Sequence, residues 1–188
     1  MPSSLLIKRI LVFLVIIIIV VSSIKYMSTE DKNKVINRNP DHLISPSYGK
    51  ITGIRDQGDG YIRISIFLNL WDVHEQYMPV SGIIQNVNYK PGEFNGAYFL
   101  EKSDKNERMD TLITGPYGLV GVSQIAGYIF KTIVLDVKRG QQVEQGDKLG
   151  RIKFGSRVDL VIPNIGTKIL AKVGDKVVGG TTVLASWN

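Results

Sequence analysis

The alternation of apolar and polar residues along most of the chain predicts short β-strands. From residue 44 onward, runs rich in Val, Ile, Thr and Tyr are separated by clusters of Gly, Asp, Asn and Pro, which is typical of strands joined by tight turns. No window of about eleven residues in this region repeats its apolar positions with the 3.6-residue period of a helix. We therefore predict an all-β (mainly β) fold with a barrel-like or sandwich-like core. The expected strands cover residues 51–54, 61–68, 83–89, 111–114, 119–125, 129–138, 149–154, 158–162, 168–173 and 182–187.

One segment near the N-terminus departs from this pattern. Residues 10–21 are all apolar, Lys8 and Arg9 precede them, and Lys25 follows. A helix over residues 1–27 reaches the roughly 30 Å of a bilayer's hydrocarbon core when its flanking basic side chains extend toward the headgroups. We therefore expect residues 1–27 to form a retained single-pass transmembrane helix and the protein to be located at a membrane. The alternative is a secretory signal peptide, cleaved after the small residues that end the run.

The rest of the chain divides into a linker and one domain. Residues 28–43 are polar and charged, as expected of a juxtamembrane linker. Residues 44–188 form the predicted β domain, which contains an internal repeat. The pattern Gly140-x-x-Val143-x-x-Gly146 recurs 34 residues later as Gly174-x-x-Val177-x-x-Gly180. Two copies are too few for a solenoid, but they resemble the tight turns of lipoyl-type domains.

Composition limits the chemistry that the chain can perform. There are no cysteines and only two histidines, which excludes disulfides, thiolate metal sites and thiol nucleophiles; we expect no metal site. The net charge of +6 is compatible with an anionic membrane surface as a partner. No dense basic block with interleaved aromatic residues occurs, so we expect no nucleic-acid partner. The sequence leaves homo-oligomerisation open.

A Gly-Ser step at Gly155-Ser156 lies between two predicted strands. A hairpin turn is the ordinary interpretation of such a step. It also permits chemistry, because a serine hydroxyl on a strained turn can attack the carbonyl carbon of the preceding residue. A glycine at that preceding position removes the side chain that would crowd the attack.

The sequence around this step carries a family resemblance. Phe154-Gly155-Ser156-Arg157-Val158-Asp159, followed by an apolar run that ends at Pro163, resembles the self-cleavage site of the phosphatidylserine decarboxylase family, in its short, membrane-attached type. The resemblance implies an N-to-O acyl shift that breaks the chain between Gly155 and Ser156. The resulting ester eliminates to dehydroalanine, which hydrolyses to a pyruvoyl group and ammonia. It thus implies a zymogen whose cofactor derives from Ser156 and whose small fragment, 156–188, stays bound to the large one.

A second segment indicates a proton-transfer residue. Asp72-Val73-His74, with Pro79-Val80-Ser81-Gly82 after four further residues, resembles the family pattern D-V-H-x-x-x-x-P-V-S-G. The resemblance implies that phosphatidylserine forms a Schiff base with the pyruvoyl group and loses CO2 to give phosphatidylethanolamine. His74 is then the expected proton donor and acceptor, because an imidazole titrates near neutral pH. We expect Asp72 to orient the local backbone.

Two further segments resemble the family's N-E-R and Q-I-A-G patterns, namely Asn106-Glu107-Arg108 and Gln124-Ile125-Ala126-Gly127. We expect them to border the site without performing a chemical step. The matched segments begin near residue 37 and reach the C-terminus, about four-fifths of the chain.

The chain departs from the family pattern at two positions. Where the family has S-P-A-D-G-K-V, this chain has Tyr48 in place of the aspartate; a phenol with a pKa near 10 cannot replace an ionised carboxylate at pH 7. Longer members place a second histidine three residues after the first, where this chain has Tyr77. Two interpretations therefore stay open. One is a self-processing decarboxylase, in which Asp56, Asp59 or Asp72 substitutes for the missing carboxylate. The other is a catalytically silent, membrane-bound lipid-binding or adaptor protein.

Overall fold

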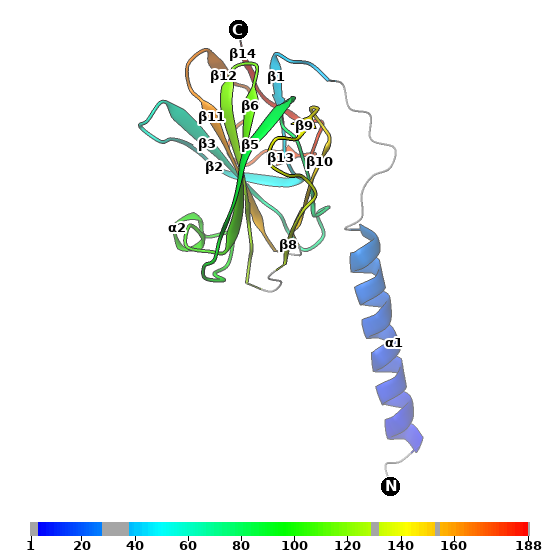
Figure 1. The fold of residues 1–188 in the computed structure, drawn as a ribbon. Helices are drawn as coiled ribbons and strands as arrows, with labels where there is room; N and C mark the ends of the chain where they lie inside the picture. Colours follow the sequence, from blue (N-terminus) through cyan, green and yellow to red (C-terminus); the bar gives the residue numbers. More distant parts are fainter. Residues whose placement is uncertain (1–3, 28–37, 129–131, 153–154, 188) are drawn as a thin grey trace.

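The computed structural model describes residues 4–27, 38–128, 132–152 and 155–187, with side chains described from residue 6 to residue 22 in the N-terminal helix. The described protein is mainly β, as predicted, and its largest sheet is strongly curled (Figure 1). The helices within these residues are α1 (Ser4–Met27) and α2 (Leu100–Ser103). The strands are β1 (His42–Ile44), β2 (Gly49–Asp56), β3 (Tyr61–Phe67), β4 (Glu75–Tyr77), β5 (Gly82–Lys90), β6 (Arg108–Gly115), β7 (Gly118–Ile125), β8 (Ile133–Leu135), β9 (Gln142–Val143), β10 (Lys148–Ile152), β11 (Arg157–Pro163), β12 (Thr167–Ile169), β13 (Lys176–Val177) and β14 (Val183–Trp187).

Three sheets hold the described strands. The largest has the order β13-β2-β3-β11-β7-β6-β5-β9, and two three-stranded sheets have the orders β1-β14-β12 and β4-β10-β8. Each of the ten predicted strands overlaps one of these. Two of the predictions extend into residues outside the described part of the chain, at 129–131 and 153–154. The linker predicted for residues 28–43 is also largely outside it, and its last residues already belong to β1, which pairs with β14.

β11 occupies an interior position of the large sheet, antiparallel to β3 on one side and to β7 on the other. Its side chains alternate between the two faces, because successive residues of a strand point in opposite directions. Val158, Leu160 and Ile162 are fully buried in the apolar core. Arg157 and Asp159 point to the opposite face, where α2 covers the sheet. The residue after the Gly-Ser step is therefore fixed by two neighbouring strands and by a helix.

The internal repeat forms the two edges of the large sheet. β9 and β13 each contain the valine of one copy and pair with β5 and β2 respectively. The hydrogen bonds match as well: Gly140 N–H donates to Ile84 O at 2.8 Å, and Gly174 N–H donates to Ile51 O at 2.9 Å. All four repeat glycines have positive φ, a conformation that side chains disfavour. The repeated pattern thus specifies two equivalent turns that end the sheet.

The predicted transmembrane helix is not supported. In the part of the chain that the structure describes, no helix is both long and apolar enough to cross a membrane.

Candidate active site

Ser156 lies at the entrance to β11 and is completely buried. Its carbonyl oxygen accepts a hydrogen bond from Leu68 N–H at 2.9 Å. Its hydroxyl has no hydrogen-bond partner within the described residues. A buried hydroxyl without a partner is costly and uncommon in folded proteins. Gly155 precedes it with φ +70°, a left-handed conformation that favours glycine. The Gly-Ser step is therefore a tight turn that leads into an interior strand, with a free nucleophile at its end.

His74 lies against this turn. Its Nε2 accepts a hydrogen bond from Gly155 N–H at 3.3 Å, and its Nδ1 is 2.6 Å from the carbonyl oxygen of Asp72. Both contacts are satisfied together by one tautomer, with the proton on Nδ1 and the lone pair on Nε2. Burial lowers the pKa of His74 below its ordinary 6.5, although the Asp72 carbonyl and carboxylate oppose that shift. The imidazole is thus held neutral, with Nε2 directed at the turn.

Asp72 has the role that the sequence predicted for it. Its carboxylate accepts a hydrogen bond from Asn69 N–H at 2.7 Å, which closes the turn before His74. Its backbone carbonyl oxygen accepts a hydrogen bond from His74 Nδ1–H. Asp72 therefore positions the imidazole through the backbone and does not contact the Gly-Ser step in the described structure.

Gly127 is the residue that makes room for the turn. A methyl carbon added at this glycine would stand 1.6 Å from the Gly155 carbonyl oxygen. Asn106 fixes the neighbouring residue, because its amide nitrogen donates to Ala126 O at 2.8 Å, and Ala126 N–H donates to Glu107 O at 2.9 Å. The N-E-R and Q-I-A-G segments are thus bonded to each other beside the carbonyl that the predicted cleavage would attack.

A pair of buried amides supports His74 from behind. Gln124 Nε2 donates to Gln76 Oε1 at 2.9 Å, and Gln76 Nε2 donates to His74 O at 3.0 Å. Both glutamines are fully buried. Because buried amide groups need hydrogen-bond partners, these two hydrogen bonds fix the His74 backbone relative to β7. Sequence reasoning did not identify Gln76; its only signal was an uncharged polar residue two positions after the histidine.

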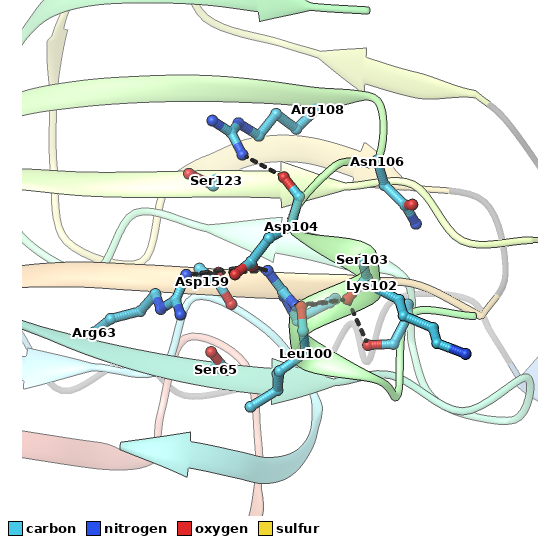
Figure 2. A network of polar contacts seen from close by, with 12 residues as sticks. Arg63, Ser65, Leu100, Lys102, Ser103, Asp104, Asn106, Arg108, Ser123 and Asp159 are labelled. Carbon is cyan, nitrogen blue, oxygen red and sulfur yellow. Dashed lines mark hydrogen bonds and ion pairs between the residues drawn. The ribbon is translucent and has the colours of Figure 1, made fainter. Parts of the chain in front are cut away.

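Arg157, next to Ser156, is buried in a network of ion pairs beneath α2. Its guanidinium donates to the Asp159 carboxylate at 2.9 Å, to Ser103 Oγ at 2.6 Å and to Leu100 O at 2.9 Å, and it also pairs with Asp104. Figure 2 shows Asp104 between Arg63, which pairs with its carboxylate, and Arg108 of β6, which donates a hydrogen bond to its backbone carbonyl oxygen. These bonds join the start of β11 to α2.

The network is balanced in charge. Two arginines, Arg63 and Arg157, face two carboxylates, Asp104 and Asp159. Burial raises the pKa of Asp159, while Arg157, Ser65 and Arg63 oppose that rise. Sequence reasoning assigned no function to these residues, because the partners are separated by up to 96 positions in the chain and only the fold brings them together.

The two departures from the family pattern lie together. The rings of Tyr48 and Tyr77 have their centroids 6.4 Å apart and are tilted by 58°. The segment that carries Tyr48, between β1 and β2, meets β4 through Tyr77 N–H, which donates to Pro46 O at 2.8 Å. Tyr77 follows His74 by three residues in the chain. The expected alternative carboxylates, Asp56 and Asp59, instead bond to the turn at residues 56–61.

Several predicted residues could not be placed. Lys153 and Phe154, which begin the Gly-Ser motif, lie outside the described residues. No group of three His, Cys, Asp or Glu side chains that could hold a metal ion occurs in the described part of the chain. The pyruvoyl group expected from Ser156 fits the residues present. The serine is buried, its hydroxyl has no described partner, and the neighbouring position 127 has room only for a glycine.

Comparison with known proteins identifies the relatives of this chain. The model of the family described as phosphatidylserine decarboxylase matches residues 24–185. A protein from Azorhizobium caulinodans named phosphatidylserine decarboxylase proenzyme is 41% identical over 155 residues, which cover 78% of this chain and 66% of the relative. A protein of the same name from Chlorobaculum parvum is 38% identical over 159 residues, covering 82% and 74%.

A third relative of that name, from Nitrobacter winogradskyi, is 44% identical over 127 residues, covering 67% of this chain and 51% of the relative. The chain thus spans between about half and three quarters of the length of these relatives. The family match extends across the β domain and includes the Gly-Ser turn, His74 and the two segments bonded beside them. On this evidence, the chain belongs to the phosphatidylserine decarboxylase family.

Proposed function

We propose that this protein is a self-processing decarboxylase that converts phosphatidylserine to phosphatidylethanolamine in phospholipid biosynthesis. The observation that carries the proposal is the position of His74, whose neutral Nε2 is bonded to the Gly155 backbone, one residue before a buried serine without a described partner. The names of the relatives support the same activity.

In the uncut chain, Ser156 Oγ is the nucleophile and the Gly155 carbonyl carbon is the atom attacked. Gly127 allows the carbonyl to sit in the turn, and the left-handed Gly155 keeps the peptide bent. Neutral His74 is the base nearest to this step along the described hydrogen bonds, and its Nε2 must release Gly155 N–H before it accepts the Ser156 proton. Burial of the serine and the imidazole excludes water, which would otherwise compete for the carbonyl.

His74 has a second role after cleavage. Its Nε2 is occupied by Gly155 N–H in the uncut chain, so it is available for other proton transfers only when the Gly155 end moves away. The pyruvoyl group derived from Ser156 supplies an electron sink for loss of CO2. Nε2 then holds or returns the proton at the substrate's α-carbon, and the Asp72 carbonyl keeps Nδ1 protonated throughout. Cleavage thus exposes the residue that the decarboxylation requires.

The location follows from α1. Residues 10–21 are all apolar, and each side chain is at least 41% exposed. A contiguous apolar surface of this kind requires a lipid or protein cover. We propose that α1 contacts the lipid bilayer that contains the substrate, so that the enzyme is membrane-associated.

The second candidate is the silent lipid-binding or adaptor protein, which the Tyr48–Tyr77 contact favours because two phenols cannot replace a carboxylate and an imidazole at neutral pH. Intact mass of the purified full chain separates the two. Self-processing gives chains of 155 and 33 residues, the smaller with a blocked N-terminus, and Ser156→Ala abolishes both. One uncut chain that persists after long incubation would exclude the decarboxylase and leave the second candidate.

The activity needs its own measurement. Cut protein should release CO2 from phosphatidylserine vesicles, and the Ser156→Ala protein should release none. A protein that cuts itself but leaves phosphatidylserine unchanged would contradict the assigned substrate while keeping the assigned cleavage.

A further inference from the structure

The outer side of α2 borders a pocket of about 460 Å³ that the proposed chemistry does not use. β2 forms one wall, α2 with the residues before it forms the second, and the loop at Val173 and Gly174 closes the third. Leu100 packs so closely on the sheet that a methyl carbon at Gly53 would lie 2.9 Å from its Cδ1. The pocket is therefore a feature of the packed fold.

Three cations line this pocket: Lys50, Arg55 and Lys102. All three are exposed, and Glu101 is the pocket's one acidic residue. Among the described residues, no carboxylate lies within ion-pair distance of any of the three cations. Figure 2 shows Lys102 directed away from the ion-pair network beneath the helix. The pocket thus has an uncompensated positive charge.

Two exposed aromatic rings form its rim. Tyr98 and Phe99 are 58% and 61% exposed, and Val173 beside them is 58% exposed. The rings are held in place, because Phe67 of β3 meets Tyr98 edge to face at 5.3 Å and Tyr98 meets Phe99 in the same way at 5.8 Å. Rigid aromatic rings next to basic side chains are typical of protein surfaces at the boundary between water and lipid.

The pocket is connected to the Gly-Ser step. Phe67, the base of the aromatic series, lies opposite Arg157 in the sheet. Arg157 in turn donates a hydrogen bond to Leu100 O, which lines the pocket. The pocket is therefore linked to the start of β11 through the hydrogen bond between Leu100 and Arg157.

We propose that this surface docks the protein on a bilayer that contains anionic phospholipid, with a lipid phosphate in the basic pocket and Tyr98 and Phe99 inserted at the headgroup level. The inference rests on the proposed function only in one respect: an enzyme whose substrate is a membrane lipid needs a surface that docks on the membrane. Charge complementarity favours this occupant: three unpaired cations attract a surface of phosphates, and the apolar rim suits the boundary with the acyl chains.

The absence of cysteine allows a local test in the full chain that does not depend on α1. Phe99→Cys, labelled with an environment-sensitive fluorophore, reports contact with vesicles that carry lipid-bound quenchers. Ile165→Cys, on a residue that is 89% exposed and does not line the pocket, is the matched control. Both carry Ser156→Ala, so that the result depends neither on cleavage nor on decarboxylation.

We expect quenching at residue 99 with phosphatidylcholine vesicles that contain phosphatidylglycerol, loss of that quenching at high salt, and none at residue 165. The triple exchange Lys50→Glu, Arg55→Glu, Lys102→Glu should weaken vesicle binding of the labelled surface, measured by quenching, about tenfold or more. The control triple Lys138→Glu, Arg139→Glu, Lys168→Glu removes the same six units of charge from exposed positions outside the pocket and should retain most of the quenching.

Three results would overturn the inference: no lipid quenching at residue 99, equal quenching by vesicles without phosphatidylglycerol, or an equal loss in the two triples. Displacement of the labelled surface from vesicles by a single-stranded oligonucleotide at low concentration would also overturn it, because it would assign the site to nucleic acid. Charge-dependent quenching in a protein that decarboxylates nothing would keep this inference and reject the proposed activity.

Discussion

Gly127 and the carbonyl oxygen of Gly155 approach so closely that no side chain fits between them: an added methyl carbon would stand 1.6 Å from that oxygen. We predict that Gly127→Ala pushes the Gly155 carbonyl out of reach of Ser156 Oγ. A displacement of about 1 Å at a reacting carbonyl can lower a rate about 100-fold. The fraction of cut chain against time, read from denaturing gels, measures the effect.

Gly121→Ala is the matched control for that change. It lies on β7 in the same sheet, and its added carbon would meet Val161 at 3.5 Å, an ordinary packing distance. Its cleavage rate should equal that of the parent protein. Normal cleavage in Gly127→Ala would show that the turn rearranges before it reacts.

The pH dependence of cleavage should follow His74. Burial lowers its pKa below 6.5, so the neutral imidazole persists at pH 6.5 and becomes protonated only at more acidic pH. The cleavage rate should therefore stay constant as pH falls from 8 through 6.5, and then decline about tenfold per unit below the lowered pKa. Protonated Nε2 can neither accept a proton nor keep its bond to Gly155 N–H.

His74→Gln tests this assignment. The amide approximates the shape of the imidazole but does not titrate in this range, so the remaining slow cleavage should lose its acidic decline. A variant that cuts as fast as the parent, with the same pH profile, would remove His74 from the reaction.

The Tyr48–Tyr77 pair gives a prediction about the speed of processing. The double exchange Tyr48→Asp, Tyr77→His places a carboxylate next to an imidazole at the two positions where this chain departs from its family. General acid–base groups contribute at least about 100-fold in favourable sites, so cleavage should accelerate about tenfold or more. Time courses after expression at low temperature measure it. Tyr48→Phe should leave the rate unchanged, and an unaltered rate in the double variant would contradict our account of the pair.

The ion-pair network predicts a coupled effect on stability. Arg157→Met leaves the buried Asp159 carboxylate without its closest partner, which should lower the free energy of unfolding by about 3–5 kcal/mol. Adding Asp159→Asn removes that unpaired charge and should restore part of the loss. Urea unfolding in the Ser156→Ala background measures both. The exposed Arg139→Met, as control, should change stability by less than about 0.5 kcal/mol; simple additivity of the two exchanges would contradict the coupling.

Much of the fold could be predicted from local pattern, but only where elements are long enough to show a period. The longer strands β2, β3, β7 and β11 were predicted within a few residues of their bounds. The two-residue strands β9 and β13 were not, although the repeat that contains them was recognised. The four-residue helix α2 is shorter than two helical turns and carries no periodic signal.

The candidate site divides in the same way. Ser156 and His74 were predicted from motifs, because their chemistry depends on residue type at fixed spacing. Gly127 belonged to a recognised segment, but its role follows from a distance to Gly155 that no sequence pattern contains. The same holds for Asp104, which reaches Arg157 only through the turn after α2. Long-range contacts of this kind depend on topology and could not be derived from the chain alone.

The interior position of β11 sets the molecularity of folding. Residues 156–188 supply β11 between β3 and β7, β13 beside β2, and the strands β12 and β14, which form a three-stranded sheet with β1 of the other fragment. Under the proposed cleavage, the chain folds once as a single molecule and afterwards exists as two interlocked ones. Unfolding the cut protein would release two fragments whose reunion is bimolecular and dilution-dependent. The mature protein would thus show hysteresis, because its heating and cooling curves would differ. A cut molecule that unfolds no longer has the peptide bond that kept its two fragments together during the first folding.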